Sequence, residues 1–137
     1  MIEGIYWVCV LYKTIPADSS TLISLSKIFK RNISSIHNIL IYDNSQMSIR
    51  EVNFFSHNVS VLFHHNSKNI SLAVAYNYAL QKATDLKKKW LVLLDQDSVL
   101  GSDFLVQLIN SIDIVQNDDP ILNFHKWIKL LIPFGQV

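Results

Sequence analysis

Short runs of apolar residues recur along the chain and predict the strands of a buried sheet. Residues 5–11, 38–42 and 90–94 are almost continuously apolar, which is typical of strands covered on both faces. Residues 59–63 alternate between apolar and polar positions, which is also typical of a strand. The pattern therefore predicts four strands.

Segments with apolar residues at helical spacing lie between these runs. Turn and N-cap residues precede a predicted helix over residues 22–29, and residues 71–84 form an alanine- and leucine-rich helical pattern. Ser102 is predicted to cap a further helix that carries Asp103 in its first turn. A weaker, short helix is expected at residues 49–55.

Strands and helices alternate in a way that is typical of β-α-β units with parallel strands. We expect an α/β fold: an open, mainly parallel, doubly wound sheet with right-handed crossovers. Residues 1–117 are assigned to this domain. Residues 118–137 form an apolar C-terminal tail, and two structures stay open for it. One is a strand-plus-helix fragment of the core, and the other is an amphipathic helix at a membrane surface.

Composition narrows the function classes. The chain has 137 residues, enough for one ordinary domain, and 50% of them are hydrophobic, which predicts a substantial core. A formal net charge of +1 provides no strong field for nucleic acid, so no nucleic-acid partner is expected. No apolar stretch approaches the roughly twenty residues that a membrane-spanning helix needs. The single cysteine, Cys9, is expected to be a buried thiol in a reducing compartment, the cytoplasm.

Polar residues that follow the predicted strands are the candidates for chemistry, because ligands of open α/β sheets bind at the carboxyl ends of the strands. Asp43, Asn44 and Ser45 follow one strand, and Asp95 and Asp97 follow another. If the strand order is 3-2-1-4, both acidic clusters flank the central strand. Carboxylates gathered there suit a hard divalent cation, or a base and sugar that offer hydrogen-bond donors.

Other interpretations of the same residues stay open. Asp43 and its neighbours are also ordinary turn residues, and Asp95 and Asp97 could instead cap the helix that follows. His64 and His65 are adjacent on a predicted strand and point to opposite faces, so a shared metal ion is not expected. No glycine follows the first strand, which argues against a dinucleotide-binding or P-loop function.

Four motifs, taken in order, resemble those of family 2 glycosyltransferases with the GT-A (Rossmann-like) fold, most closely the bacterial rhamnosyltransferase-like branch. They are an apolar strand ending in Tyr-Lys, then Ile-Tyr-Asp-Asn-Ser, then Asn-x-x-Leu-Ala-x-Ala-x-Asn, then Leu-Leu-Asp-Gln-Asp-Ser. The resemblance covers residues 6–108. It implies a transferase that binds a nucleotide-diphosphate sugar, dTDP- or UDP-linked.

The resemblance also implies roles for single residues. Tyr12 would line the nucleobase, and Asp43 would accept hydrogen bonds from the base or the ribose. Asn69 and Asn77 match the asparagines of the segment that helps to close the nucleotide pocket. Asp95 would hold the ribose or a metal-bound water.

Asp97 is the metal ligand that the resemblance implies. It would coordinate Mg²⁺ or Mn²⁺ bridging the diphosphate of the donor. A bound ion of this kind stabilises the negative charge on a departing nucleoside diphosphate. Transfer would proceed by direct displacement with inversion at the anomeric carbon.

The chain departs from the family pattern at two points. Ser71 stands where the family usually has glycine. The general base that inverting transfer needs comes from a later part of these enzymes, and we assign no general base to this chain. The resemblance therefore implies a sheet truncated after its fourth or fifth strand, with residues 118–137 as the start of a missing acceptor-binding half.

The expected partners follow from the resemblance. The acceptor would be a glycan or lipid-linked precursor of a surface polysaccharide, so peripheral association with the inner face of the cell membrane is expected. Apolar surface left by a missing half would favour homo-oligomers. A different class of function also stays open, an α/β binding or assembly module without transferase activity. A phospho-receiver domain is disfavoured because Tyr12 and Lys13 occupy the place of its acidic pair.

Overall fold

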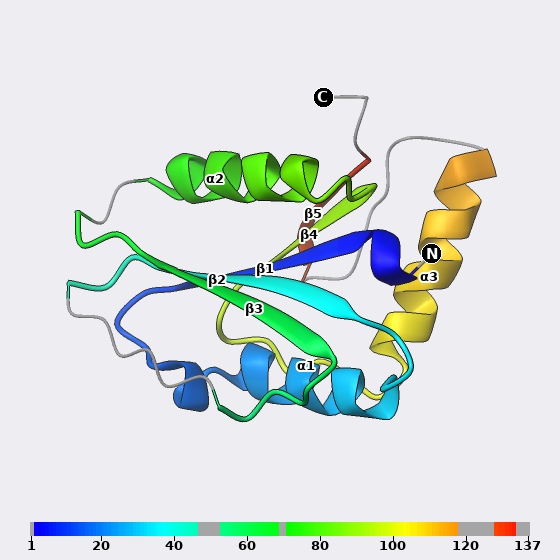
Figure 1. The fold of residues 1–137 in the computed structure, drawn as a ribbon, viewed down its shortest axis with the longest axis horizontal. Helices are drawn as coiled ribbons and strands as arrows, with labels where there is room; N and C mark the ends of the chain where they lie inside the picture. Colours follow the sequence, from blue (N-terminus) through cyan, green and yellow to red (C-terminus); the bar gives the residue numbers. More distant parts are fainter. Residues whose placement is uncertain (1, 47–52, 69–70, 118–127, 134–137) are drawn as a thin grey trace.

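The computed structural model describes residues 2–46, 53–68, 71–117 and 128–133 (Figure 1). Within these residues, the strands form one sheet in the order β3-β2-β1-β4-β5. The first four strands in this order are parallel, and β5 runs antiparallel to β4. The strands are β1 (Ile5–Leu11), β2 (His37–Asp43), β3 (Val59–His65), β4 (Trp90–Leu94) and β5 (Ile128–Pro133).

Helices cover both faces of this sheet. They are α1 (Ser20–Arg31), α2 (Leu72–Asp85) and α3 (Phe104–Asn117), together with the short 3-10 helices η1 (Ile2–Gly4) and η2 (Pro16–Asp18). Figure 1 shows α1 and α2 on opposite faces, and the buried residues of α3, such as Phe104 and Leu108, pack into the same core as α1. The predicted α/β fold with an open, mainly parallel, doubly wound sheet is confirmed.

Alternate residues of the central strand β1 build two separate cores. On the side of α1, Trp7 is fully buried and its ring meets Phe29 edge-on, with 5.4 Å between ring centroids. On the side of α2, Tyr6 and Val8 pack with the small residues Ala75 and Ala79. Apolar residues at consecutive positions of one strand are therefore used on both faces, which explains the unbroken apolar runs.

Helix boundaries agree with the predicted pattern except at α3. The Ser19 hydroxyl accepts a hydrogen bond from the Leu22 amide at 3.2 Å and caps α1 as expected. Ser102 was predicted to cap α3, which is wrong, because that helix begins at Phe104. Asp103 takes the position before the first helical residue, since its carbonyl oxygen accepts from the Gln107 amide at 3.0 Å.

Two further predictions concern segments that are only partly described. Residues 53–55 are not helical, and residues 47–52 of the predicted short helix lie outside the described residues. Of the C-terminal tail, residues 128–133 form β5 in the sheet, and the remainder lies outside the described residues. Among the described residues, no helix combines the length and apolar character that crossing a membrane requires.

Candidate functional site

The carboxyl ends of β1, β2 and β4 form one edge of the sheet. Leu11 at the end of β1 is level with Asp43 at the end of β2. On the other side of β1, Cys9 is level with Leu94, the last residue of β4. Because β1 lies between β2 and β4, the polar residues that end these two strands flank the central strand, as the expected strand order requires.

The turn after β2 contains buried polar atoms. Asp43 is 3% exposed, and its Oδ1 accepts a hydrogen bond from the Ser45 amide at 2.9 Å. The Asn44 amide donates to the carbonyl oxygen of Leu11 at 2.8 Å, which ties this turn to the end of β1. Asn44 Oδ1 is buried without a hydrogen-bond partner among the described residues. Buried side-chain acceptors are usually hydrogen-bonded, so this oxygen can still accept a hydrogen bond.

Hydrogen bonds hold the backbone at the end of β1 to the turn after β2. Lys13 has a positive φ of 53°, which is uncommon for a residue with a side chain. Its amide donates to Ser45 Oγ at 2.8 Å, and His65 Nε2 donates to the Ser45 carbonyl oxygen at 2.7 Å. Tyr12 remains 43% exposed, with the Lys13 ammonium 5.2 Å from its ring centroid. The Tyr12 ring is thus available to a ligand at this edge.

The segment after β4 forms an acidic turn, defined here as residues 95–98. Hydroxyl groups at the start of α1 hold its backbone. Ser19 Oγ donates to the Gln96 carbonyl oxygen at 2.8 Å, and Thr21 Oγ1 donates to the Asp95 carbonyl oxygen at 2.5 Å. Thr21 Oγ1 also accepts from the Ser98 amide at 2.8 Å. These three backbone groups of the acidic turn are therefore satisfied without using its carboxylates.

The two carboxylates of the acidic turn differ in their surroundings. Asp95 is partly buried, and its Oδ1 accepts a hydrogen bond from Ser98 Oγ at 2.6 Å. Asp97 is exposed, and no described residue forms a hydrogen bond with its side chain. Asp95 is positioned within the turn, whereas Asp97 is free to bind a group from solution.

Gln96 joins the acidic turn to the end of β1. Its Oε1 accepts from the Tyr12 amide at 2.8 Å, and its Nε2 donates to the Tyr12 carbonyl oxygen at 3.2 Å. The sequence did not reveal this pairing, because a glutamine between two aspartates carries no periodic signal. Both polar atoms of the Gln96 side chain are used in this link, so the groups of the turn that could bind a cation are the carboxylates of Asp95 and Asp97.

Two groups near the acidic turn have raised pKa values. Burial raises the pKa of the Cys9 thiol to about 12, and the nearby Asp95 and Asp97 carboxylates also raise it. Cys9 is therefore an inert buried thiol, as predicted. Burial, and then the charge of Asp95, raises the pKa of Tyr76 on α2. Tyr76 lies within electrostatic reach of the site, and the sequence motifs did not single it out.

The two adjacent histidines make separate contacts. His64 stacks on Tyr78 of α2, with 4.1 Å between ring centroids, and lies 5.1 Å from the Tyr42 ring. Burial lowers the pKa of His64, and the charge of Lys82 lowers it further. His65 instead bonds the turn after β2, so the two side chains do not share a ligand.

The assignment of Asn69 and Asn77 to the nucleotide pocket stays a prediction. Asn77 is exposed on α2, whose buried side is formed by Ala75, Ala79 and Ala83, and no described residue forms a hydrogen bond with it. Asn69 lies outside the described residues. Within the described part of the chain, no group of three or more His, Cys, Asp or Glu side chains could hold a metal ion between them. Any metal at the acidic turn would have to take its other ligands from a bound molecule or water.

Comparisons with known proteins give one distant structural neighbour to report. No protein-family model matches the chain, and no curated protein matches it closely enough to be counted as a relative. A solved structure from Desulfovibrio desulfuricans G20, described as a proposed nucleotide-diphospho-sugar transferase, gives a TM-score of 0.45 at 11% identity. The match covers 84% of this chain and 55% of that protein, so the chain spans about half of its neighbour's length. Likeness at this level carries no argument about activity.

Proposed function

We propose that the chain is the donor-binding part of a family 2 glycosyltransferase of the rhamnosyltransferase-like branch. It binds a nucleotide-diphosphate sugar, dTDP- or UDP-linked, together with Mg²⁺ or Mn²⁺. One observation carries the proposal. At the carboxyl edge, Asp97 is exposed on an acidic turn that hydroxyl groups at the start of α1 hold by its backbone, and Asp43 ends the strand on the other side of β1. This is the edge at which open α/β sheets bind ligands.

The side of β2 suits the nucleoside. Asp43 uses Oδ1 within its turn, and no described residue donates to its Oδ2. Asn44 adds the buried acceptor oxygen that lacks a partner. The N–H groups of a pyrimidine base or the hydroxyls of a ribose are donors that such oxygens accept. The exposed ring of Tyr12 offers a stacking surface beside them.

The acidic turn suits the diphosphate end of the donor. Mg²⁺ is commonly held by one or two carboxylates, with phosphate oxygens and waters completing its shell. Asp97, with Asp95 beside it, fits that requirement, whereas a site made only of protein ligands would need a larger cluster. When bound, the metal offsets the charge on the leaving nucleoside diphosphate. Asp97 would ligate it directly, and Asp95 would orient a bound water or the ribose.

The transfer step itself needs groups that we do not assign here. Inverting displacement requires a general base next to the acceptor hydroxyl. Asp103 is unsuited to that role because its Oδ2 accepts a hydrogen bond from Gln107 Nε2 at 2.7 Å at the start of α3. We propose that the base and the acceptor site belong to a further part of the transferase. The acceptor would be a glycan or lipid-linked precursor, met at the inner face of the cell membrane.

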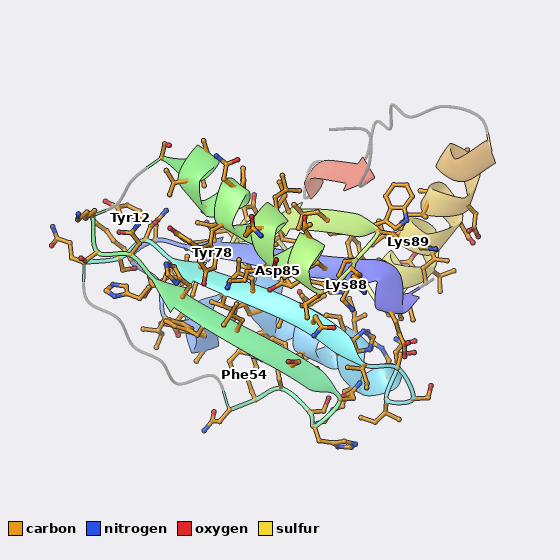
Figure 2. All side chains as sticks on the ribbon, turned by 45° about the horizontal axis from the view of Figure 1, so that its top comes forward. Tyr12, Phe54, Tyr78, Asp85, Lys88 and Lys89 are labelled. Carbon is orange, nitrogen blue, oxygen red and sulfur yellow. The ribbon has the colours of Figure 1, made fainter. Side chains whose placement is uncertain are left out.

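Calorimetric titration tests the proposal. UDP and dTDP are titrated with and without Mn²⁺ into the wild-type chain, Asp97→Asn and Asp85→Asn. Asp85 is an exposed aspartate near the far end of α2 and serves as the matched control (Figure 2). We expect binding that requires Mn²⁺ and that Asp97→Asn weakens at least about tenfold, with Asp85→Asn unchanged. Binding of the same affinity with and without Mn²⁺, or the absence of binding, would overturn the proposal.

A further inference from the structure

The Thr21 hydroxyl links the two ends of the acidic turn. Oγ1 donates its proton to the Asp95 carbonyl oxygen at 2.5 Å and accepts from the Ser98 amide at 2.8 Å. Thr21 is fully buried, so water does not compete for either bond. The two residues that it bonds are those that bracket Gln96 and Asp97. One hydroxyl therefore fixes the separation of the first and last residues of the turn.

The same contacts join the turn to a rigid helix. Thr21 lies in the first turn of α1, where backbone amides have no acceptor within the helix. Its amide donates to the Gln96 carbonyl oxygen at 3.4 Å, and Ser19 Oγ donates to that oxygen at 2.8 Å. Leu22, next to Thr21, is fully buried in the core. The start of α1 and the acidic turn thus satisfy each other's free polar groups.

We infer that Thr21 is a positioning residue for the donor-binding site, an inference that rests on the proposed function. It does not touch the donor. Its hydroxyl holds the turn in the shape that directs Asp97 toward the carboxyl edge. Without the hydroxyl, the Ser98 amide loses its buried acceptor, and the Asp95 carbonyl keeps only the weaker Cys9 thiol donor at 3.8 Å, so the turn must move to find other partners. Loss of such a supporting contact typically weakens metal binding about 10- to 100-fold.

Ser24 supplies a matched control on the same helix. Its Oγ accepts a hydrogen bond from the Leu100 amide at 3.1 Å, just beyond the acidic turn. Ser24 is also buried, so its removal disturbs the same packing layer between α1 and the loop after β4. A merely structural role for Thr21 would make the two positions equivalent. If Thr21 is a positioning residue, only its substitution will weaken metal-dependent binding of the donor.

The experiment compares Thr21→Val, Thr21→Ser and Ser24→Ala in the full chain, by calorimetric titration of UDP in saturating Mn²⁺. We expect Thr21→Val to weaken binding at least about tenfold, Thr21→Ser to restore it to within about twofold, and Ser24→Ala to leave it within about twofold. Unchanged binding in Thr21→Val, or equal weakening in Ser24→Ala, would overturn the inference. If Thr21→Val does not fold, Thr21→Ala replaces it, with the same two outcomes.

Hydrogen exchange separates this inference from the proposed function. Amide exchange at Gln96–Ser98 is measured without any ligand in the wild-type chain, Thr21→Ala and Ser24→Ala. We expect exchange at the Ser98 amide to accelerate in Thr21→Ala and not in Ser24→Ala, because only Thr21 accepts that proton. Failure of the wild type to bind UDP would remove the proposed function and the donor role of Thr21, but not the hold of Thr21 on the acidic turn. Unchanged exchange at Ser98 would remove the positioning role of Thr21, whatever the wild type binds.

Discussion

Buried polar side chains donate to backbone carbonyl oxygens at both ends of the sheet, but the two ends differ in the acidic groups that lie beside them. At the carboxyl end, small hydroxyl groups of Ser19 and Thr21 satisfy the backbone of the acidic turn. The carboxylate of Asp97 is left exposed. At the amino end, the side chains of Asn58 and His37 donate hydrogen bonds to backbone carbonyl oxygens. Among the described residues, Asp97 therefore presents an exposed carboxylate without a hydrogen-bond partner at the carboxyl end, which is why we place the site there.

The amino end is organised around the last turn of α1. Asn58 Nδ2 donates to the carbonyl oxygens of Phe29 at 3.2 Å, Asn32 at 3.2 Å and Ser35 at 3.0 Å. His37 Nε2 donates to the Asn32 carbonyl oxygen at 3.1 Å, and its ring stacks on Phe29 at 4.2 Å. Helix C-termini leave carbonyl oxygens without partners, and these side chains supply the donors. These donors support the end of α1, while His37 Nδ1 is buried without a hydrogen-bond partner among the described residues.

The charged groups of the amino end are also separate from the site. Figure 2 shows Tyr12 at one end of the sheet and Lys88 and Lys89 at the other. The Lys88 ammonium donates to the carbonyl oxygen of Glu3 at 2.7 Å. These lysines follow α2 and have no contact with the acidic turn among the described residues. The comparison predicts that the two ends respond differently to substitution.

The largest effect on stability is expected from Asn58→Ala. One buried and two partly buried carbonyl oxygens would lose their shared donor, which should cost about 3 kcal/mol of unfolding free energy. Urea unfolding of the variant measures this cost, and Asn53→Ala, at an exposed position, serves as the control. Affinity for UDP and Mn²⁺ should not change in the folded protein. A loss below about 1 kcal/mol would show that water replaces the amide.

Acid should destabilise the amino end next, through His37. Burial lowers the pKa of His37 below its ordinary value of 6.5; the Asn32 carbonyl and Glu3 raise it in part, and Lys88 lowers it. Below pH 6.5, His37 binds a proton more readily in the unfolded chain than in the folded chain. The free energy of unfolding therefore falls as the pH falls through that window.

The measurement is the free energy of unfolding against pH. His37→Phe keeps a ring against Phe29 and removes the titration, so its profile should be flatter below pH 6.5 than that of the wild type. His57→Gln, at an exposed position, should leave the slope unchanged. The prediction fails if the two variants show the same profile.

At the carboxyl end, Gln96→Ala should cost about 1 kcal/mol of unfolding free energy, because two hydrogen bonds to the Tyr12 backbone are lost where water has partial access. Gln81→Ala removes an exposed bond from the Gln81 amide to Asp85 and is the control. Thermal unfolding compares the two variants. Gln96→Ala should also weaken UDP binding, since it releases the β1 end from the acidic turn. Stability loss without weaker binding would argue that the link is purely structural.

The smallest effect is expected from Lys88→Met, about 0.5 kcal/mol or less, because its hydrogen bond is exposed to solvent. Chemical unfolding measures it, with Lys89→Met as the neighbouring control. UDP binding should be unchanged in both variants. Weaker binding in either one would mean that the amino end contributes to the ligand site and would break the comparison.

The sequence was sufficient to predict the elements that carry the fold. The runs at β1, β2 and β4 are apolar at consecutive positions, a pattern that only a sheet covered on both faces requires. The strand ends then located Asp43 and the acidic turn. For β5 the sequence left two alternatives open, because the apolar residues 118–137 suited a strand-plus-helix fragment as well as an amphipathic helix. The predicted cap at Ser102 was wrong because Ser102 and Asp103 are equally good capping residues by composition.

The supporting contacts of both ends could not be predicted, because their partners are distant in the chain. Thr21 meets the acidic turn across more than seventy residues, and Asn58 meets Phe29 across 29. A threonine at the start of a helix and an asparagine before a strand have ordinary local explanations. Only the three-dimensional arrangement shows that each one satisfies a buried backbone group elsewhere. The role of Asn69 and the position of the domain boundary at residue 117 stay predictions.

The central position of β1 has a consequence for how the chain acquires its structure. Ile5–Leu11 is synthesised early, yet one of its two pairing partners, Trp90–Leu94, is synthesised long afterwards. A nascent chain can pair β1 with β2, but the other edge of β1, which is apolar and has free hydrogen-bonding groups, stays uncovered until β4 has been synthesised. Long-range parallel pairing of this kind folds slowly and exposes the chain to aggregation. Production of the protein should therefore depend on chaperone capacity more than on the stability of the finished sheet.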